Sequence, residues 1–363
     1  MFREENREVQ DPDAGITPNW SVPSRLSRRE TLKQTLLAGL FLPRAFGQRG
    51  WGGRRGRRYV DPSQIPVYRY KTLPVSRFRE LQAEYDKSLA SQYYTRAKAF
   101  RDQVANLSFK TPGDFTAAKS VIVVAAFTKS MYARFTLDGA QFRLLVPPQY
   151  YADDMNPAKL RGIVQKEIIK NTNSRIVDIS DRVPLKLLAA RSGLGLYGKN
   201  NLIFVDGMGN YNLLYAFATD YAFAEDNWTQ LNILGRCRRC DHCVRSCPTA
   251  CFWDGVLPFN IDKCVTLYNE KPGAFPNWMM RSSHTALMGC LRCLDSCPEN
   301  GGYAEISEML EDVTEDETRK ILKGMADDAL LKSLQRKLRQ FPATLSREAF
   351  PILTRNLSVL TRS

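Results

Sequence analysis

Eight of the nine cysteines fall into two runs that each end in Cys-Pro, and their spacing is typical of ligands for two 4Fe-4S clusters. In proteins that hold two such clusters, the fourth cysteine of each run binds the other cluster. The first cluster is therefore predicted to be held by Cys237, Cys240, Cys243 and Cys297. The second cluster is predicted to be held by Cys247, Cys264, Cys290 and Cys293.

Zinc and disulfides are the alternative uses of closely spaced cysteines. Cys-x2-Cys pairs also bind zinc, but a closed site of four ligands does not require the crossed Cys-Pro pattern twice. A disulfide framework is not expected in dense local runs of a chain long enough to bury an ordinary core. The ninth cysteine, Cys251, stands where a small apolar residue would fit, and it is predicted to be a buried bystander.

The N-terminal segment has the features of a twin-arginine export signal. Arg28 and Arg29 precede an apolar run of about nine residues, and Ala45-Phe46-Gly47 is a small-x-small cleavage pattern. Residues 1–58 are therefore predicted to be a signal peptide with a basic linker, which places the protein in the periplasm or on the outer face of the membrane. The alternative is a surface helix in a cytoplasmic protein. The apolar run is too short to span a bilayer, and no transmembrane helix is expected in the mature chain.

The net charge of +14 is unevenly distributed along the chain. Residues 1–58 carry 12 Lys and Arg against 6 Asp and Glu, which leaves +8 for the remainder. A mildly basic body suits an acidic redox donor or an anionic substrate as well as a phosphate backbone. The expected partners are a small electron-donor protein or membrane redox partner and a small organic substrate, and nucleic acid is not expected.

Residues 59–228 alternate strand and helix patterns and predict an α+β domain. Residues 117–127 are an apolar, β-branched run of the buried-strand type, and residues 157–171 have helical spacing of their apolar side chains. Two further strands are predicted at 201–204 and 211–219, with a turn at 207–210 between them.

Three glycines, Gly193, Gly195 and Gly198, match the dinucleotide-binding fingerprint, but their surroundings do not. The fingerprint needs a strand before it and a helix after it. Here a helix pattern at 183–192 comes first and a strand pattern at 201–204 follows. The glycines are instead predicted to end the helix and to form a turn whose backbone passes close to something bulky.

The segment "VPLKLLAARSGLGLYGKNNLI" and the crossed cysteine runs resemble the family of epoxyqueuosine reductases and respiratory reductive dehalogenases. The resemblance covers roughly residues 90–363. It implies a nitroreductase-like cobalamin-binding α/β sandwich in residues 59–228. It also implies a double 4Fe-4S ferredoxin-type domain in residues 229–304 and a helical C-terminal segment in residues 305–363.

The same resemblance implies cobalamin as a second cofactor. The residues expected to approach it are Gly193, Gly195, Gly198 and Lys199. The two histidines, His242 and His284, both lie in the cluster region, so a bound corrinoid is expected to be base-off without a histidine ligand.

The catalytic acid of the epoxyqueuosine reductases lies in a Tyr-Ala-x-Gly-Arg-Asp-Tyr-His segment, and Asn156 stands at the matching position here. An amide cannot protonate a substrate, so Tyr151, Asp153 or Asp154 is expected to replace the acid. The alternative is a helix cap, with Asp154 or Asn156 as the N-cap residue.

Three functions follow from these patterns. The first is an exported, corrinoid-dependent reductase that passes electrons through two clusters to the cobalt and reduces a small organic substrate. The second is an exported electron-transfer protein without a corrinoid. The third is a cytoplasmic epoxyqueuosine reductase that acts on tRNA.

Overall fold

The computed structural model describes residues 60–90, 104, 106–146, 156–252, 260–339 and 345–361. The predicted export signal in residues 1–58 lies outside these ranges, as do Tyr151, Asp153 and Asp154. Among the helices of the described part, none is long and apolar enough to cross a membrane.

A four-stranded antiparallel sheet forms the centre of the first part of the fold. Its order is β1 (Tyr68–Pro74), β2 (Ser120–Phe127), β8 (Asn212–Thr219) and β5 (Ile176–Asp178). Nearly every residue of β2 is buried, because successive side chains point into two different cores on the two faces of the sheet. The strands predicted at 117–127 and 211–219 are confirmed.

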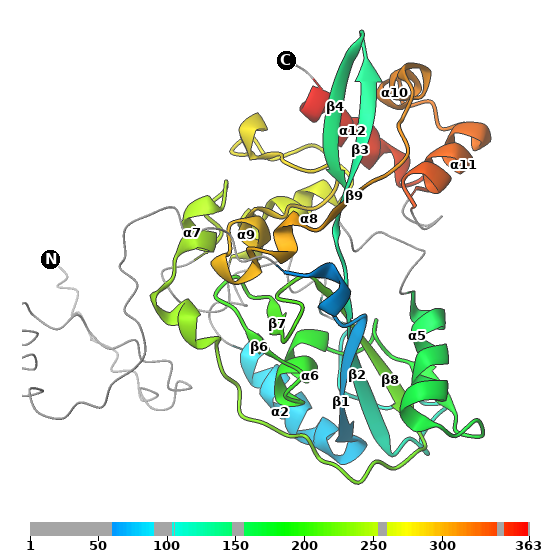
Figure 1. Ribbon diagram of the computed structural model, residues 1–363, viewed down its shortest axis with the longest axis vertical. Coiled ribbons are helices and arrows are strands. Elements are labelled where there is room, and N and C mark those ends of the chain that lie inside the picture. The colour runs from blue at the N-terminus through cyan, green and yellow to red at the C-terminus, as the bar shows by residue number, and fades with distance from the viewer. Residues whose placement is uncertain are drawn as a thin grey trace, which may run out of the picture. The chain divides into compact units, whose positions relative to one another are not determined.

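Helices cover both faces of this sheet (Figure 1). On one face lie α2 (Phe78–Leu89) and α6 (Leu185–Arg191), whose apolar side chains pack against Val121 and Val123 of β2. On the other face, α5 (Pro157–Ile163) continues directly into a π-helical turn, η4 (Val164–Ile169). Their buried positions repeat at helical spacing and pack against Ile122 and Val124, as the sequence pattern predicts.

A two-stranded hairpin follows α6, and its order confirms the rejection of the dinucleotide fingerprint. The helix ends at Ser192, and Gly193 adopts a left-handed φ of +69°. Strands β6 (Gly195–Tyr197) and β7 (Ile203–Val205) then pair in antiparallel fashion.

The cluster region consists of short helical turns separated by loops. These are η5 (Gly235–Arg239), α7 (His242–Ser246), η6 (Ile261–Lys263), α8 (Val265–Asn269), η7 (Arg281–Ser283), α9 (Arg292–Asp295), η8 (Pro298–Asn300) and η9 (Tyr303–Glu305). Each predicted ligand except Cys290 lies in one of these turns or directly beside one, and Cys290 lies two residues before α9.

The C-terminal helices pack against a hairpin from much earlier in the chain (Figure 1). Strands β3 (Ser130–Leu137) and β4 (Ala140–Val146) form this hairpin, and β9 (Ser307–Met309) joins β3 in parallel. Helices α10 (Glu315–Leu322), α11 (Asp328–Lys337) and α12 (Phe350–Thr361) complete its core. The mixed α+β content is therefore as predicted, but this packing joins residues that the sequence divided between 59–228 and 305–363.

Candidate iron-sulfur site

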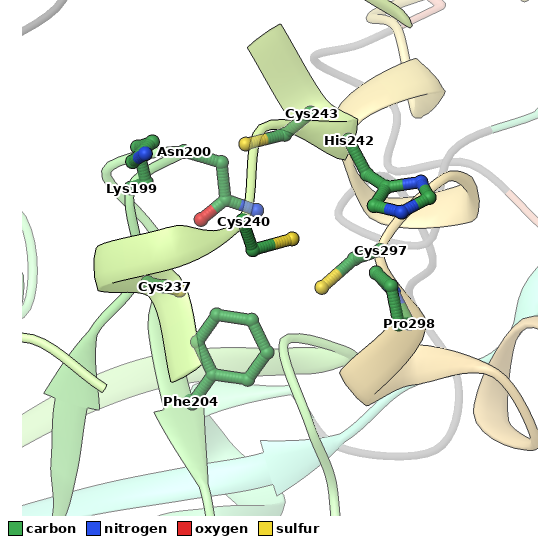
Figure 2. A pocket seen from close by; sticks show the side chains of 9 residues that line it. All are labelled: Lys199, Asn200, Phe204, Cys237, Cys240, His242, Cys243, Cys297 and Pro298. Carbon is green, nitrogen blue, oxygen red and sulfur yellow. The ribbon is translucent and has the colours of Figure 1, made fainter. Parts of the chain in front are cut away.

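The four cysteines predicted to hold the first cluster line one pocket. They share it with five other residues, so that the lining consists of Lys199, Asn200, Phe204, Cys237, Cys240, His242, Cys243, Cys297 and Pro298. Figure 2 shows the Sγ atoms of Cys240 and Cys297 directed toward each other across this space. The fourth residue of the second run thus lies with the first three residues of the first run, which is the arrangement that crossed ligation requires.

Local backbone geometry brings the first-run cysteines together. Cys237 lies in η5, and its backbone N–H donates to Leu234 O. Cys240 then adopts an extended conformation that separates η5 from α7, and α7 carries Cys243. The short helical turns direct cysteines that have two residues between them toward a common centre. The Cys-x2-Cys spacing therefore produces a concave set of ligands.

Serine side chains tie the two runs to each other. The Oγ atoms of Ser246 in α7 and Ser296 beside α9 are 2.7 Å apart, and Ser246 also donates to Arg292 O. The backbone N–H of Cys297 donates to Leu294 O at the end of α9. These bonds connect α7 with α9 and hold Cys297 beside the first run.

The protein environment of the first pocket opposes free thiolates. Burial raises the pKa of Cys243 and of Cys297 to about 11. Burial also raises the pKa of Cys237, although the Lys199 backbone N–H, which donates to its sulfur, acts in the opposite direction. A positively charged metal cluster favours deprotonation of its ligands, so binding would release protons from these thiols.

The cysteines predicted for the second cluster lie near one another, and Cys251 lies among them. Cys251 is buried, with 3% of its surface exposed, as predicted. Its Sγ is 3.3 Å from that of Cys247, and it lowers the pKa of the nearby Cys264 thiol. Burial raises the pKa of Cys290 and of Cys293, and the charges of the neighbouring cysteines add to the rise. Within the described ranges, no three His, Cys, Asp or Glu side chains are placed to chelate a single metal ion.

The glycines expected to approach a corrinoid instead face their own hairpin. A Cβ at Gly195 would lie 2.5 Å from Ile203 and from the Phe204 carbonyl, and a Cβ at Gly198 would overlap the Phe204 ring. The bulky neighbour predicted from the sequence is therefore Phe204. At Gly193 the nearest neighbour is Thr229.

Lys199, the fourth residue expected at the corrinoid, lies at the first cluster pocket. Its ammonium group is 2.7 Å from Asp241, it is 14% exposed, and it holds the pKa of Asp241 below its usual range. Among the described residues, the four are therefore seen in contact with the hairpin, Thr229 and Asp241, and these contacts do not bring them together around one common space.

Asn156 acts as a helix cap. Its side-chain oxygen accepts a hydrogen bond of 2.8 Å from the Lys159 backbone N–H at the start of α5. The capping alternative is thus confirmed for this residue. The other three catalytic candidates, Tyr151, Asp153 and Asp154, lie outside the described residues.

The sequence reasoning missed three buried asparagines, of which Asn200 lines the first pocket and the other two are joined to it by hydrogen bonds. Asn300 accepts from the Asn210 backbone N–H and donates to its side-chain oxygen, and Asn200 donates to the same oxygen. The side-chain nitrogen of Asn210 has no hydrogen-bond partner among the described residues. Asn200 directly follows Lys199, and Asn300 lies three residues after Cys297, but only their meeting in space reveals the network.

A lysine near the second cluster site was also missed. Lys186 lies at the start of α6, where burial lowers the pKa of its ammonium group and the charges of Cys264 and Cys293 oppose that change. A cationic group beside thiolates would favour a more negative, reduced cluster. The signal in the sequence is one charged residue in the first turn of an apolar helix.

The fold and the paired cysteine runs define a mixed α+β protein similar to known epoxyqueuosine reductases. The structure from Streptococcus thermophilus matches with a TM-score of 0.53 at 17% identity, over 82% of this chain and 78% of that one. An epoxyqueuosine reductase with an epoxyqueuosine-modified tRNA-Tyr stem loop matches with a TM-score of 0.50 at 16% identity, over 79% and 81% of the two chains. At these identities the similarity establishes the fold.

Sequence similarity points to the same family. The epoxyqueuosine reductase of Lactococcus garvieae is 33% identical over 116 residues, which are 32% of this chain and 31% of that protein. The enzyme of Cellulophaga algicola is 27% identical over 216 residues, 56% of this chain and 63% of that protein. The matched part thus spans less than two thirds of each of these relatives, and no family model matches. The chain is thus similar to epoxyqueuosine reductases in sequence and in fold, and the resemblance seen in the sequence is confirmed for that branch.

The expectation that nucleic acid is not a partner is contradicted by the comparison with solved structures. An epoxyqueuosine reductase of the same fold is solved with a tRNA stem loop. The expectation failed because net charge reports an average over the chain, whereas a phosphate backbone is recognised by the local arrangement of charges.

Proposed function

We propose that the chain is an iron–sulfur oxidoreductase that reduces epoxyqueuosine in tRNA. One observation carries the proposal: Cys237, Cys240, Cys243 and Cys297 line one pocket in a chain related to epoxyqueuosine reductases. This is the third of the functions that the sequence left open. The tRNA substrate favours the cytoplasmic alternative over export.

The proposed reaction is a two-electron reduction. Conversion of the epoxide to an alkene breaks two C–O bonds, forms one C=C bond and releases the oxygen as water, with two electrons and two protons consumed. Two 4Fe-4S clusters held by the crossed cysteine sets would supply electrons at low potential. The crossed arrangement supports short-range electron transfer, because each run contributes a ligand to both sites.

The residues around the first pocket have positioning roles in this proposal. The Lys199 backbone N–H donates to Cys237, and the Lys199 ammonium is fixed by Asp241. Hydrogen bonds and positive charge near ligand sulfurs favour the reduced state of a cluster. Phe204 and Pro298 contribute apolar surface to the lining of the pocket.

The proton donor is proposed to come from the segment before α5. Asn156 caps that helix and carries no acidic proton, which leaves Tyr151, Asp153 and Asp154 as candidates. Single Tyr151→Phe, Asp153→Asn and Asp154→Asn variants identify the donor, because the variant that lacks it should lose turnover by 10²-fold or more, roughly, while keeping its iron.

The proposed reaction has no step through a corrinoid, because the residues expected to hold one have other contacts. Iron and cobalt are therefore measured together on protein reconstituted without oxygen and with cobalamin present. About eight iron atoms per chain and no cobalt are expected. About one cobalt per chain would contradict a reaction without a corrinoid and would favour the corrinoid-dependent reductase.

The activity itself is tested on tRNA that carries epoxyqueuosine. The reconstituted protein is reduced with dithionite, and the nucleosides are analysed by mass spectrometry for loss of one oxygen atom. Conversion by the wild-type protein and loss of conversion in Cys237→Ala would support the proposal. A protein that holds about eight iron atoms and binds the tRNA but leaves the epoxide intact would overturn it.

A further inference from the structure

Cys251 lies in contact with Cys247, one of the cysteines predicted to hold the second cluster. Its Sγ is 3.3 Å from the Cys247 Sγ, and it lowers the pKa of the nearby Cys264 thiol. Its backbone N–H also approaches the Cys247 sulfur at 3.4 Å. We propose that Cys251 is a fifth ligand thiol of the second cluster site and can replace Cys247 there. This inference rests on the proposed presence of the clusters.

The backbone between Cys247 and Cys251 explains how the two sulfurs meet. Ala250 has a φ of +49°, in the left-handed region that residues other than glycine adopt only at an energetic cost. Its N–H donates to the Cys247 carbonyl, which closes a tight turn. The turn folds the chain back, so that Cys251 comes to lie over Cys247.

A second contact fixes Cys251 from the other side. The Asn260 backbone N–H donates to the Cys251 carbonyl at 2.7 Å. Asn260 directly precedes η6, and Cys264 directly follows it. The segment that carries Cys264 is therefore attached to the backbone of Cys251 by a main-chain hydrogen bond.

These contacts differ from those of an ordinary buried thiol. A bystander cysteine behaves as a small apolar side chain and needs only apolar contacts. The Sγ of Cys251 instead lies 3.3 Å from the sulfur of Cys247. Soft thiolates are the ligands that iron–sulfur clusters use, and a third thiol within 3.3 Å of a ligand can reach the same iron by a change of rotamer.

The exchange needs no oxidant or reductant. The iron–sulfur bond to Cys247 breaks and the bond to Cys251 forms, while the proton of the Cys251 thiol passes to the Cys247 thiolate. The charge of the site and the oxidation state of the iron stay unchanged. The structure places donor and acceptor sulfur in direct contact for this transfer.

Iron content and electron paramagnetic resonance of the dithionite-reduced protein test the proposal without any turnover of tRNA. Four proteins are reconstituted in parallel: wild type, Cys247→Ala, Cys251→Ala and the double variant. The wild type and both single variants should hold about eight iron atoms, with a changed spectrum in Cys247→Ala. The double variant should hold about seven or fewer, because neither thiol is left. Cys237→Ala is the matched control, and it should lose iron because its pocket has no fifth thiol among its lining residues.

Loss of as much iron from Cys247→Ala as from the double variant would overturn the inference. Far-ultraviolet circular dichroism separates a misfolded variant from one that lost a ligand, and Cys247→Ser repeats the test with a smaller change of volume. A wild-type protein without iron would overturn both this inference and the proposed function. A wild type with full iron and no tRNA reduction would overturn only the proposed function.

Discussion

Asn300 is the centre of the buried polar contacts beside the first cluster pocket. It has no exposed surface and bonds Asn210 twice and the Leu294 carbonyl once. Asn210 is 90 residues away in the sequence and adjacent in space. The two bonds to Asn210 therefore connect the β7–β8 turn with the turn that follows Cys297.

Asn300→Ala should lower the free energy of unfolding by about 2–3 kcal/mol, because it leaves buried polar groups of Asn210 without partners. Urea unfolding of the iron-loaded protein measures the change. Asn232→Ala is the control, since Asn232 is exposed and donates only to a nearby carbonyl at 3.4 Å. Its effect should stay within about 0.5 kcal/mol. Equal effects of the two variants would contradict the structural role of Asn300.

Gly198 is required by the close approach of Phe204. A methyl group at this position would overlap the Phe204 ring and lie 2.6 Å from the Asn200 side-chain oxygen. Gly198→Ala should therefore destabilise the protein by about 1–3 kcal/mol. Gly162→Ala is the control, because its Cβ would meet nothing within 4 Å and alanine favours the helix by about 1 kcal/mol. A thermal shift assay should move the two melting temperatures in opposite directions, and a neutral Gly198→Ala would refute the packing argument.

At the scale of elements, a half-buried ion pair joins α10 to α11. Glu317 accepts from Lys337 at 2.6 Å, from Ser333 at 2.6 Å and from the Thr314 backbone N–H at 2.8 Å. Burial alone would raise the pKa of Glu317, but these bonds outweigh it and lower the pKa to about 2.

Since the pKa of Glu317 is lower in the folded than in the unfolded state, its stabilising effect is present above about pH 4.5 and is lost as the pH falls toward 2. Lys337→Met should therefore cost about 2 kcal/mol at pH 7 and clearly less at pH 3. Urea unfolding at both pH values measures this. Lys320→Met, which removes an exposed pair with Asp316, should change little at either pH. If Lys337→Met lowered the free energy of unfolding by the same amount at both pH values, the ion pair with Glu317 would not be the cause.

The elements that the sequence predicted are those with local signals. The strand at β2 and the helices α5 and α6 were found because burial leaves a periodic pattern in a single segment. The pairing of β3 with β9 was not found, because it joins residues about 180 positions apart and β9 has only three residues. Tertiary contact decides such short strands.

The candidate site also contains residues that the sequence could predict and residues that it could not. The ligand cysteines were found because their spacing is local and specific. The asparagine network and the proximity of Cys251 to Cys264 were not found, since each depends on segments that meet only after folding. The corrinoid residues were expected from the resemblance, and the packing of Phe204 accounts for two of them.

At the scale of the whole described molecule, α12 connects the C-terminal core to the second cluster region. Asn356 is buried and donates to the carbonyls of Asn269 and Leu287 at 2.8 and 2.9 Å. Arg355 donates to the Tyr268 carbonyl and lies over the Phe275 ring. The helix thereby fixes the segment between Cys264 and Cys290.

Asn356→Ala should lower the free energy of unfolding by about 2–3 kcal/mol, because two buried carbonyls lose their donor. It should also speed the loss of iron to a chelator from the second site. Ser358→Ala on the same helix is the control and should leave the rate of iron release near that of the wild type. Unchanged iron release in Asn356→Ala would show that α12 does not stabilise the second cluster region.

The shared pocket of Cys237 and Cys297 has a consequence for the unfolded chain. These residues are 60 positions apart, so a cluster bound to both closes a loop of that length. By the chain-entropy relation used for disulfides, such a cross-link removes about 4 kcal/mol of conformational freedom from the denatured ensemble. A bound cluster would thus stabilise the fold by lowering the conformational entropy of the unfolded chain, in which the pocket is not formed. Removal of the iron would return that entropy to the unfolded chain, including parts far from the metal.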